Sequence, residues 1–157
     1  MKPRFYFDTS VFGGVFDEEF QEISTLLFNK IVSGDFICVY SNLCTTELKK
    51  APEKVRNFFL SLPKENMEFV EISKEAYILA EKYLEEKVVG KTSADDCKHI
   101  AVATINKVDL LISWNFKHIV NVFRIRGYNS VNIRNGYIQL DIRSPKEIIN
   151  TEEDDTE

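Results

Sequence analysis

The chain has 157 residues, of which 44% are hydrophobic and 29% charged, and these values fit a single globular domain. No apolar run reaches the roughly 20 residues that span a bilayer, and no apolar leader with a small-residue cleavage site follows the first residues. The three cysteines are widely spaced, which argues against a disulfide framework and against a cysteine zinc site. We therefore expect a cytosolic (cytoplasmic) protein with no membrane contact and with reduced thiols.

Acidic groups are concentrated at the C-terminal end. The net charge is -5, and the last six residues carry five negative charges, so residues 1–151 are neutral overall. A block of this kind is typical of a solvated, disordered tail. We expect one domain over residues 1–150, followed by an acidic, disordered tail at 151–157.

A second segment carries the opposite charge. Between positions 115 and 143 the only acid is Asp141, and the basic residues are Lys117, Arg124, Arg126, Arg134 and Arg143. Such an excess can bind the phosphates of a nucleic acid, although scattered surface arginines are the more frequent explanation.

The first half of the chain alternates predicted strands and helices. Residues 5–7 are strand-forming aromatics, and residues 17–32 have the apolar spacing of an amphipathic helix. A second strand is predicted at 36–40. Ser41 then begins a helix that runs to residue 50, and Pro52 opens another that runs to residue 62.

The second half continues the alternation. Residues 68–72 predict a third strand, and Ser73 begins an amphipathic helix. Residues 94–107 predict a helix that is apolar nearly all round, as expected of a buried helix. A fourth strand is predicted at 109–113, and we expect mostly helix at 118–137.

The last predicted elements are a strand at 138–142 and a short helix that begins at Ser144-Pro145 and runs to residue 149. Strands that alternate with helices at this spacing favour an α/β fold with a parallel sheet and right-handed crossovers. The predicted architecture has three layers, α/β/α, with helices on both faces of the sheet.

Four polar side chains are predicted to meet at the carboxyl edge of this sheet, where α/β proteins build their sites. Asp8 and Asn115 follow strands one and four, Glu47 lies in the helix after strand two, and Asp96 lies in the first turn of the buried helix. Taken singly, each has a plainer explanation as a turn, a cap or an exposed acid. Taken together, clustered carboxylates repel one another, and Mg²⁺ or Mn²⁺ relieves that repulsion. The set predicts metal-assisted phosphate-ester chemistry, in which one or two ions lower the pKa of an attacking water.

Five sequence segments, in a fixed order, carry a further signal. They are Phe-Asp-Thr-Ser at 7–10, Thr-Glu-Leu at 46–48, Asp-Asp-Cys-Lys-His-Ile-Ala at 95–101, Ser-Trp-Asn-Phe-Lys-His-Ile at 113–119 and Arg-Ser-Pro-Lys-Glu at 143–147. Together they resemble the PIN-domain proteins, especially the bacterial VapC-like branch, from about residue 4 to residue 149. The resemblance implies a five-stranded parallel sheet of order 3-2-1-4-5, in which strands one and four are neighbours at the topological switch.

The same resemblance implies roles for the polar residues. Asp8, Glu47 and Asp96 would be the acidic ligands of Mg²⁺ or Mn²⁺, and Ser10 would help position water or metal. Asp96 is chosen over Asp95 because the resembling pattern has its acid three residues before a histidine. Asn115 would take the place where many members have a fourth acid. It carries no charge, so a second ion would bind more weakly and activity would be low or absent.

By this resemblance the chain is an endoribonuclease that leaves 3′-hydroxyl and 5′-phosphate ends. RNA would be its substrate, and the candidates for contacts with the RNA backbone are Lys117, Arg124, Arg126 and Arg134. The resemblance further implies a homodimer and a toxin that a small antitoxin protein restrains.

Two alternatives remain open at this point. A phosphatase of the haloacid-dehalogenase type would use Asp8 as a nucleophile, but Ser10 stands where that class has a second acid. A catalytically weak or inactive PIN-like module would instead bind RNA or a protein without cutting. Asn115 and the neutral charge of residues 1–151 leave room for this second alternative.

Overall fold

The computed structural model describes residues 1–149, so the predicted acidic tail at 151–157 lies outside the described residues. Five strands form one sheet: β1 (Arg4–Phe7), β2 (Ile37–Ser41), β3 (Met67–Val70), β4 (Leu110–Ile112) and β5 (Ile142–Arg143). All pairings are parallel, and the order is β3-β2-β1-β4-β5. The predicted fold class and strand order are confirmed.

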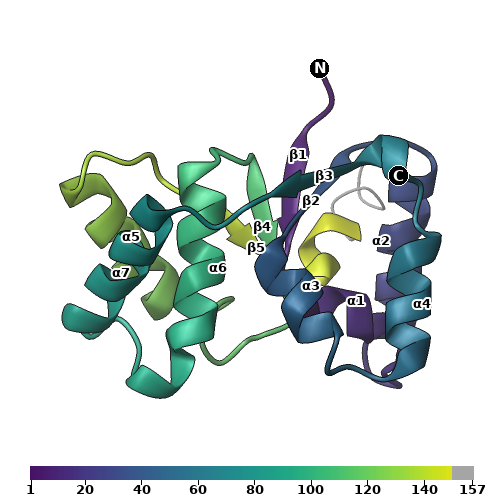
Figure 1. The fold of residues 1–157 in the computed structure, drawn as a ribbon, viewed down its shortest axis with the longest axis horizontal. Coiled ribbons are helices and arrows are strands. Elements are labelled where there is room, and N and C mark those ends of the chain that lie inside the picture. Colours follow the sequence, from purple (N-terminus) through teal and green to yellow (C-terminus); the bar gives the residue numbers. More distant parts are fainter. Residues whose placement is uncertain (150–157) are drawn as a thin grey trace.

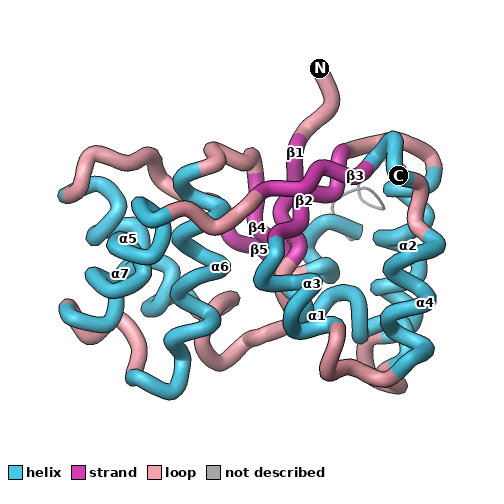
Figure 2. Tube along the Cα trace, viewed as in Figure 1, coloured by secondary structure: helices cyan, strands magenta, loops and turns pink. Residues whose placement is uncertain are grey.

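The helices are α1 (Thr9–Gly13), α2 (Gln21–Val32), α3 (Asn42–Leu48), α4 (Glu53–Ser61), α5 (Lys74–Glu85), α6 (Ala94–Ile105) and α7 (Val122–Arg134), with short 3-10 turns at η1 (Gly14–Phe16), η2 (Lys64–Asn66) and η3 (Lys91–Ser93). Residues 145–149 are also helical. Figure 1 shows α5, α6 and α7 grouped on one side of the sheet and α1, α2 and α4 on the other. The strands lie between the two groups, as the magenta trace in Figure 2 shows, which confirms the three layers.

Side-chain caps explain where several helices begin. Ser41 Oγ accepts a hydrogen bond from the backbone N–H of Leu43, and Ser73 Oγ accepts one from Ala76, so both predicted starts are confirmed. The helix predicted at 118–137 is shorter, because Asn121 caps α7 and delays its start to Val122. The helix predicted at 17–32 begins later too, at Gln21.

The fifth strand is shorter than predicted and begins at Ile142 rather than at residue 138. Asn129 of α7 explains the difference, because its side chain binds both backbone groups of Leu140. The amide nitrogen donates to the Leu140 carbonyl at 2.9 Å, and the amide oxygen accepts from the Leu140 N–H at 2.7 Å. Backbone groups satisfied in this way have no need of a sheet partner.

Strands β1 and β4 lie at the centre of the sheet and carry the site. Their register pairs Phe7 with Ile112, so the next residues, Asp8 and Ser113, leave the sheet side by side. Helices cover both faces here, and the three residues of β4 are all buried. Within residues 1–149, no helix combines the length and the apolar character that crossing a bilayer requires.

Candidate active site

Asp8 is the most buried acid of the site, with 4% of its surface exposed. Both carboxylate oxygens accept hydrogen bonds, Oδ1 from Ser10 Oγ at 2.6 Å and Oδ2 from Ser113 Oγ at 2.8 Å. Burial raises the pKa of Asp8 from 3.8 to about 6, while His99 and the two hydroxyls oppose the rise and Asp96 adds to it. The two hydroxyls therefore hold the Asp8 carboxyl in one orientation. Because its pKa is raised, this carboxyl takes up a proton at a higher pH than an ordinary aspartate does when no cation is bound.

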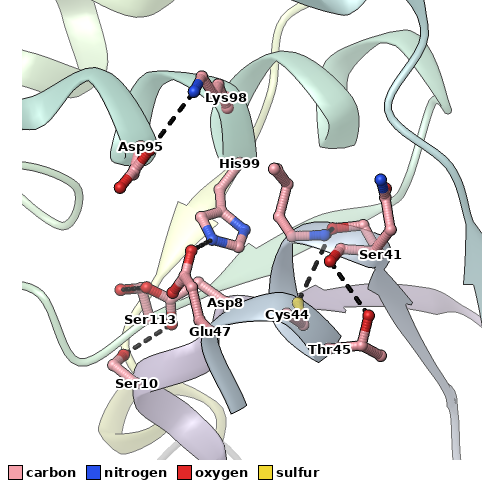
Figure 3. Close-up of polar contacts among 12 residues, drawn as sticks. Asp8, Ser10, Ser41, Cys44, Thr45, Glu47, Asp95, Lys98, His99 and Ser113 are labelled. Carbon is pink, nitrogen blue, oxygen red and sulfur yellow. Dashed lines mark hydrogen bonds and ion pairs between the residues drawn. The ribbon is translucent and has the colours of Figure 1, made fainter. Parts of the chain in front are cut away.

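Glu47 reaches from α3 toward His99 on α6, and Figure 3 shows this pair together with Asp8 and its two serines. The Glu47 Oε1 to His99 Nε2 distance is 2.8 Å. Burial raises the pKa of Glu47, but the hydrogen bond and charge of His99 outweigh burial and leave that pKa below its ordinary value. Glu47 is thus held as a carboxylate.

His99 is 3% exposed, and a buried chain of hydrogen bonds holds its ring from behind. Its Nδ1 lies 2.6 Å from the Tyr6 hydroxyl, which lies 2.8 Å from Ser41 Oγ. Burial lowers the pKa of His99, but Cys44 and Glu47 beside the ring raise it well above its ordinary value. Tyr6 stays a neutral phenol because burial raises its pKa far above 10.0. His99 therefore orients Glu47 and adds positive charge near the acids.

Asp96 lies in the first turn of α6 and is half-buried. Burial raises its pKa and Glu47 adds to the rise, while His99, His118 and a hydrogen bond from Asn115 oppose it. Asp8, Glu47 and Asp96 thus all interact electrostatically with His99. Asp95 differs from these three acids because it is exposed and its Oδ1 lies 3.5 Å from the Lys98 ammonium.

Asn115 uses its amide oxygen within its own turn. Oδ1 accepts a hydrogen bond from the backbone N–H of His118 at 3.0 Å, and the side chain lies near enough to Asp96 to oppose the rise in the pKa of that carboxyl. In this conformation one lone pair of the amide oxygen is engaged. A cation bound by Asn115 would share that oxygen with the N–H of His118.

Three buried polar atoms of the described residues have no hydrogen-bond partner, and they surround these acids in the sequence. They are Thr9 Oγ1, Ser93 Oγ and His118 Nδ1. Thr9 follows Asp8, Ser93 precedes the turn that holds Asp96, and the charge of His118 acts on Asp96. Buried polar atoms are almost always satisfied, by water if not by protein. Water or a ligand bound beside these acids would satisfy such atoms.

The donor set suits a hard divalent cation, because it consists of three carboxylates and nearby hydroxyls at one edge of the sheet. Among residues 1–149, however, no group of three or more His, Cys, Asp or Glu side chains converges tightly enough to hold a metal ion. Glu47 is turned toward His99, and Asp8 is held by its serines. The residues fit the cation by chemistry, and binding would draw their carboxylates together.

The four candidates for phosphate contacts differ in what they already bind. Arg134 forms an ion pair with Glu86, 2.5 Å between Nη2 and Oε1, and Arg124 donates to the Val88 carbonyl. Lys117 and Arg126 are exposed and form no ion pair with another described residue. Of the four candidates, Lys117 and Arg126 are therefore the ones without an ion pair among the described residues, and Arg134 is already paired with an acid.

The structure adds two residues that the sequence did not place in the site. Ser113 binds Asp8, and its position in the segment 113–119 was the available signal. His99 binds Glu47, although the sequence indicated only that it lies near the site. Neither bond could be read from spacing, because the partners lie 105 and 52 residues apart.

Comparison of the fold with solved structures finds chains of VapBC and FitAcB structures. The matches include VapBC2 from Rickettsia felis bound to a promoter DNA fragment, at 14% identity and over 90% of this chain and 98% of that one. They also include DNA-bound VapBC from Salmonella typhimurium, at 12% identity over 91% and 98%, and FitAcB from Neisseria gonorrhoeae, at 11% over 90% and 97%. All three have a TM-score of 0.55. The chain has a PIN-like fold. No protein-family model and no curated protein matches the sequence.

Proposed function

We propose that this PIN-like chain is a Mg²⁺- or Mn²⁺-dependent endoribonuclease, acting in the cytoplasm, that hydrolyses RNA phosphodiesters to 3′-hydroxyl and 5′-phosphate ends. The observation that carries the proposal is the grouping of Asp8, Glu47 and Asp96 around His99 at the carboxyl edge of the two central strands. The unsatisfied polar atoms around these acids, and solved structures of toxin–antitoxin complexes with the same fold, support it.

Each residue has a defined task in this proposal. Asp8 and Asp96 would hold the principal cation, and Glu47 would complete the set. Ser10 and Ser113 fix the direction of the Asp8 carboxylate. A bound cation of this kind lowers the pKa of a water and neutralises charge on the phosphorus and the leaving oxygen.

Two further side chains act through the acids. His99 keeps Glu47 ionised and oriented, and the Asn115 amide steadies Asp96. Because Asn115 brings no charge, we expect one principal ion and a weak second one. Lys117 and Arg126 would contact phosphates on either side of the cut, which adds affinity without sequence specificity.

Cleavage of a labelled single-stranded RNA in Mg²⁺, Mn²⁺ or EDTA tests the proposal. The wild-type protein is compared with Asp8→Asn and Asp96→Asn, and Asp95→Asn is the matched control because that acid is exposed and paired with Lys98. We expect cuts in Mg²⁺ or Mn²⁺ only, lost in the first two variants and kept in the control. Cutting that persists in EDTA or in Asp8→Asn would exclude this mechanism.

The second candidate is a binding module that holds RNA or protein without cutting it. The engaged amide oxygen of Asn115 and the absence of a converged ligand group among residues 1–149 favour it. If this candidate is right, the wild-type protein cuts no RNA in Mg²⁺ or Mn²⁺. The Asp8→Asn variant then still binds RNA as the wild type does.

We also propose that the chain is a toxin that a small antitoxin protein restrains, and that it forms a homodimer. The support is the fold of the VapBC and FitAcB complexes, together with the exposed Tyr77 and Ile78 on α5, since exposed apolar residues favour association. Expression of the wild-type chain alone should arrest growth, and Asp8→Asn should not. Light scattering tests the dimer, and a species of 18.2 kDa at all concentrations would exclude it.

A further inference from the structure

Two aromatic residues of the segment that follows β4 form a cluster with Phe20, which precedes α2. Phe20 and Trp114 stack with their ring centroids 4.2 Å apart and a tilt of 16°. Phe116 contacts both rings, at 6.4 Å from Phe20 and 6.0 Å from Trp114. We define these three residues as the aromatic cluster.

Trp114 anchors the cluster to the site. Its backbone N–H donates to Ser10 Oγ at 3.0 Å, and the same hydroxyl donates to Asp8. Its indole Nε1–H donates to Ser24 Oγ of α2 at 2.9 Å, and only 7% of the residue is exposed. Trp114 is therefore a fixed part of the core whose backbone lies one hydroxyl away from Asp8.

Phe116 is the open member of the cluster. It is 47% exposed, and both of its ring contacts are strongly tilted, at 50° and 61°. Within residues 1–149, therefore, no ring stacks face to face on Phe116. A single exposed phenylalanine is ordinary on a protein surface, so exposure alone carries no conclusion.

The neighbours of Phe116 make its position informative. Asn115, on one side, lies near enough to Asp96 to affect the pKa of that carboxyl, and Lys117, on the other, is exposed without an ion pair among the described residues. Three successive residues, Asn115, Phe116 and Lys117, thus supply a side chain near an acid, an exposed ring and a cation without an ion pair among the described residues. Surfaces that bind single strands combine these last two groups, because a base stacks on the ring while the cation meets the phosphate.

We propose that Phe116 is a stacking platform on which the proposed ribonuclease holds an unpaired base of its RNA. This inference rests on the proposed ribonuclease function. A base within a duplex is already stacked on both sides and would have to leave its helix to reach the ring. The platform therefore selects single strands, with little preference among bases because every base has a stacking face.

Binding in EDTA tests the platform without requiring cleavage. The probe is a short labelled single-stranded RNA of mixed sequence, compared with the same sequence as a duplex, at low salt. Phe116→Leu keeps an apolar side chain on Trp114 but removes the ring, and we expect it to weaken single-strand binding about tenfold, the loss of one base–aromatic stack. Phe116→Tyr should bind as the wild type does, and neither variant should change duplex binding.

Phe69→Leu on β3 is the matched control, because Phe69 is a similarly exposed ring on an edge strand that β2 and β1 separate from β4. Trp114 is the only tryptophan, so its fluorescence should respond to single-stranded RNA in the wild type and less in Phe116→Leu. Unchanged single-strand affinity in Phe116→Leu would overturn the platform and leave the ribonuclease proposal standing. A change in oligomeric state with intact RNA affinity would identify a protein interface instead, and would also overturn it. If the wild type binds no RNA at all, both proposals fail.

Discussion

Replacing Asp8 by asparagine should stabilise the metal-free protein at neutral pH. Asp8 is 4% exposed, and its pKa is raised from 3.8 to about 6, so folding disfavours its ionised form. A rise of this size corresponds to about 3 kcal/mol of destabilisation once the carboxyl is ionised in both states. Asparagine removes the charge and keeps the shape.

The gain is smaller than the full electrostatic term. Ser10 and Ser113 both donate to the carboxylate, so an asparagine NH₂ would leave one hydroxyl without its acceptor. Losing that hydrogen bond costs about 1 kcal/mol. We therefore expect Asp8→Asn to raise the free energy of unfolding by about 2 kcal/mol at pH 7.5 in EDTA.

The pH dependence separates these two effects. A folded pKa above the unfolded one stabilises the wild type at low pH, and this stability is lost as the pH rises through about 6. The advantage of Asp8→Asn should therefore shrink by about 1.4 kcal/mol between pH 7.5 and pH 5, because the lost hydrogen bond does not titrate there.

Urea denaturation at both pH values is the assay, and Asp95→Asn is the control for removing an exposed acid nearby. The control should change the free energy of unfolding by less than about 0.5 kcal/mol at either pH. If Asp8→Asn is less stable than the wild type by the same amount at both pH values, burial does not destabilise the ionised carboxylate of Asp8, and the reasoning is refuted.

Three further outcomes are expected. Mg²⁺ should raise the thermal midpoint of the wild type but not that of Asp8→Asn, and equal shifts would place the ion elsewhere. Gly14→Ala should cost about 1–3 kcal/mol in urea, because a Cβ there would lie 2.7 Å from Trp114 Nε1, whereas Gly13→Ala has open space and should be neutral. Tyr6→Phe should lower the free energy of unfolding by about 1–3 kcal/mol with the fold intact, because it removes the partner of His99 Nδ1 and one of the partners of Ser41 Oγ. A loss below about 0.5 kcal/mol would contradict the buried chain of hydrogen bonds.

The predicted fold was confirmed where local signals were strong. Ser41 and Ser73 cap helices at the predicted residues, because a cap depends on a hydroxyl and the next three backbone groups. The fifth strand was misplaced because Asn129, from α7, binds the backbone that sequence pattern assigned to the sheet. Such a contact does not alter the hydrophobic pattern of residues 138–142, so that pattern could not indicate it.

The sequence alone determined the fold class and the candidate acids. Alternating strands and helices favour a parallel sheet, and the register of that sheet follows from its apolar strands, so Asp8 must emerge at the carboxyl edge. The residue types at positions 8, 47 and 96 then favour a hard cation at that edge.

Only the tertiary structure decided how those acids are held. Ser113 fixes Asp8, His99 holds Glu47, and the Asn115 oxygen is engaged by its own turn. Each of these contacts depends on where a side chain points after the helices have packed, and the first two join residues far apart in the chain. Side-chain direction and desolvation are properties of the packed core, so the raised pKa of Asp8 and the open ring of Phe116 are visible only in the folded molecule.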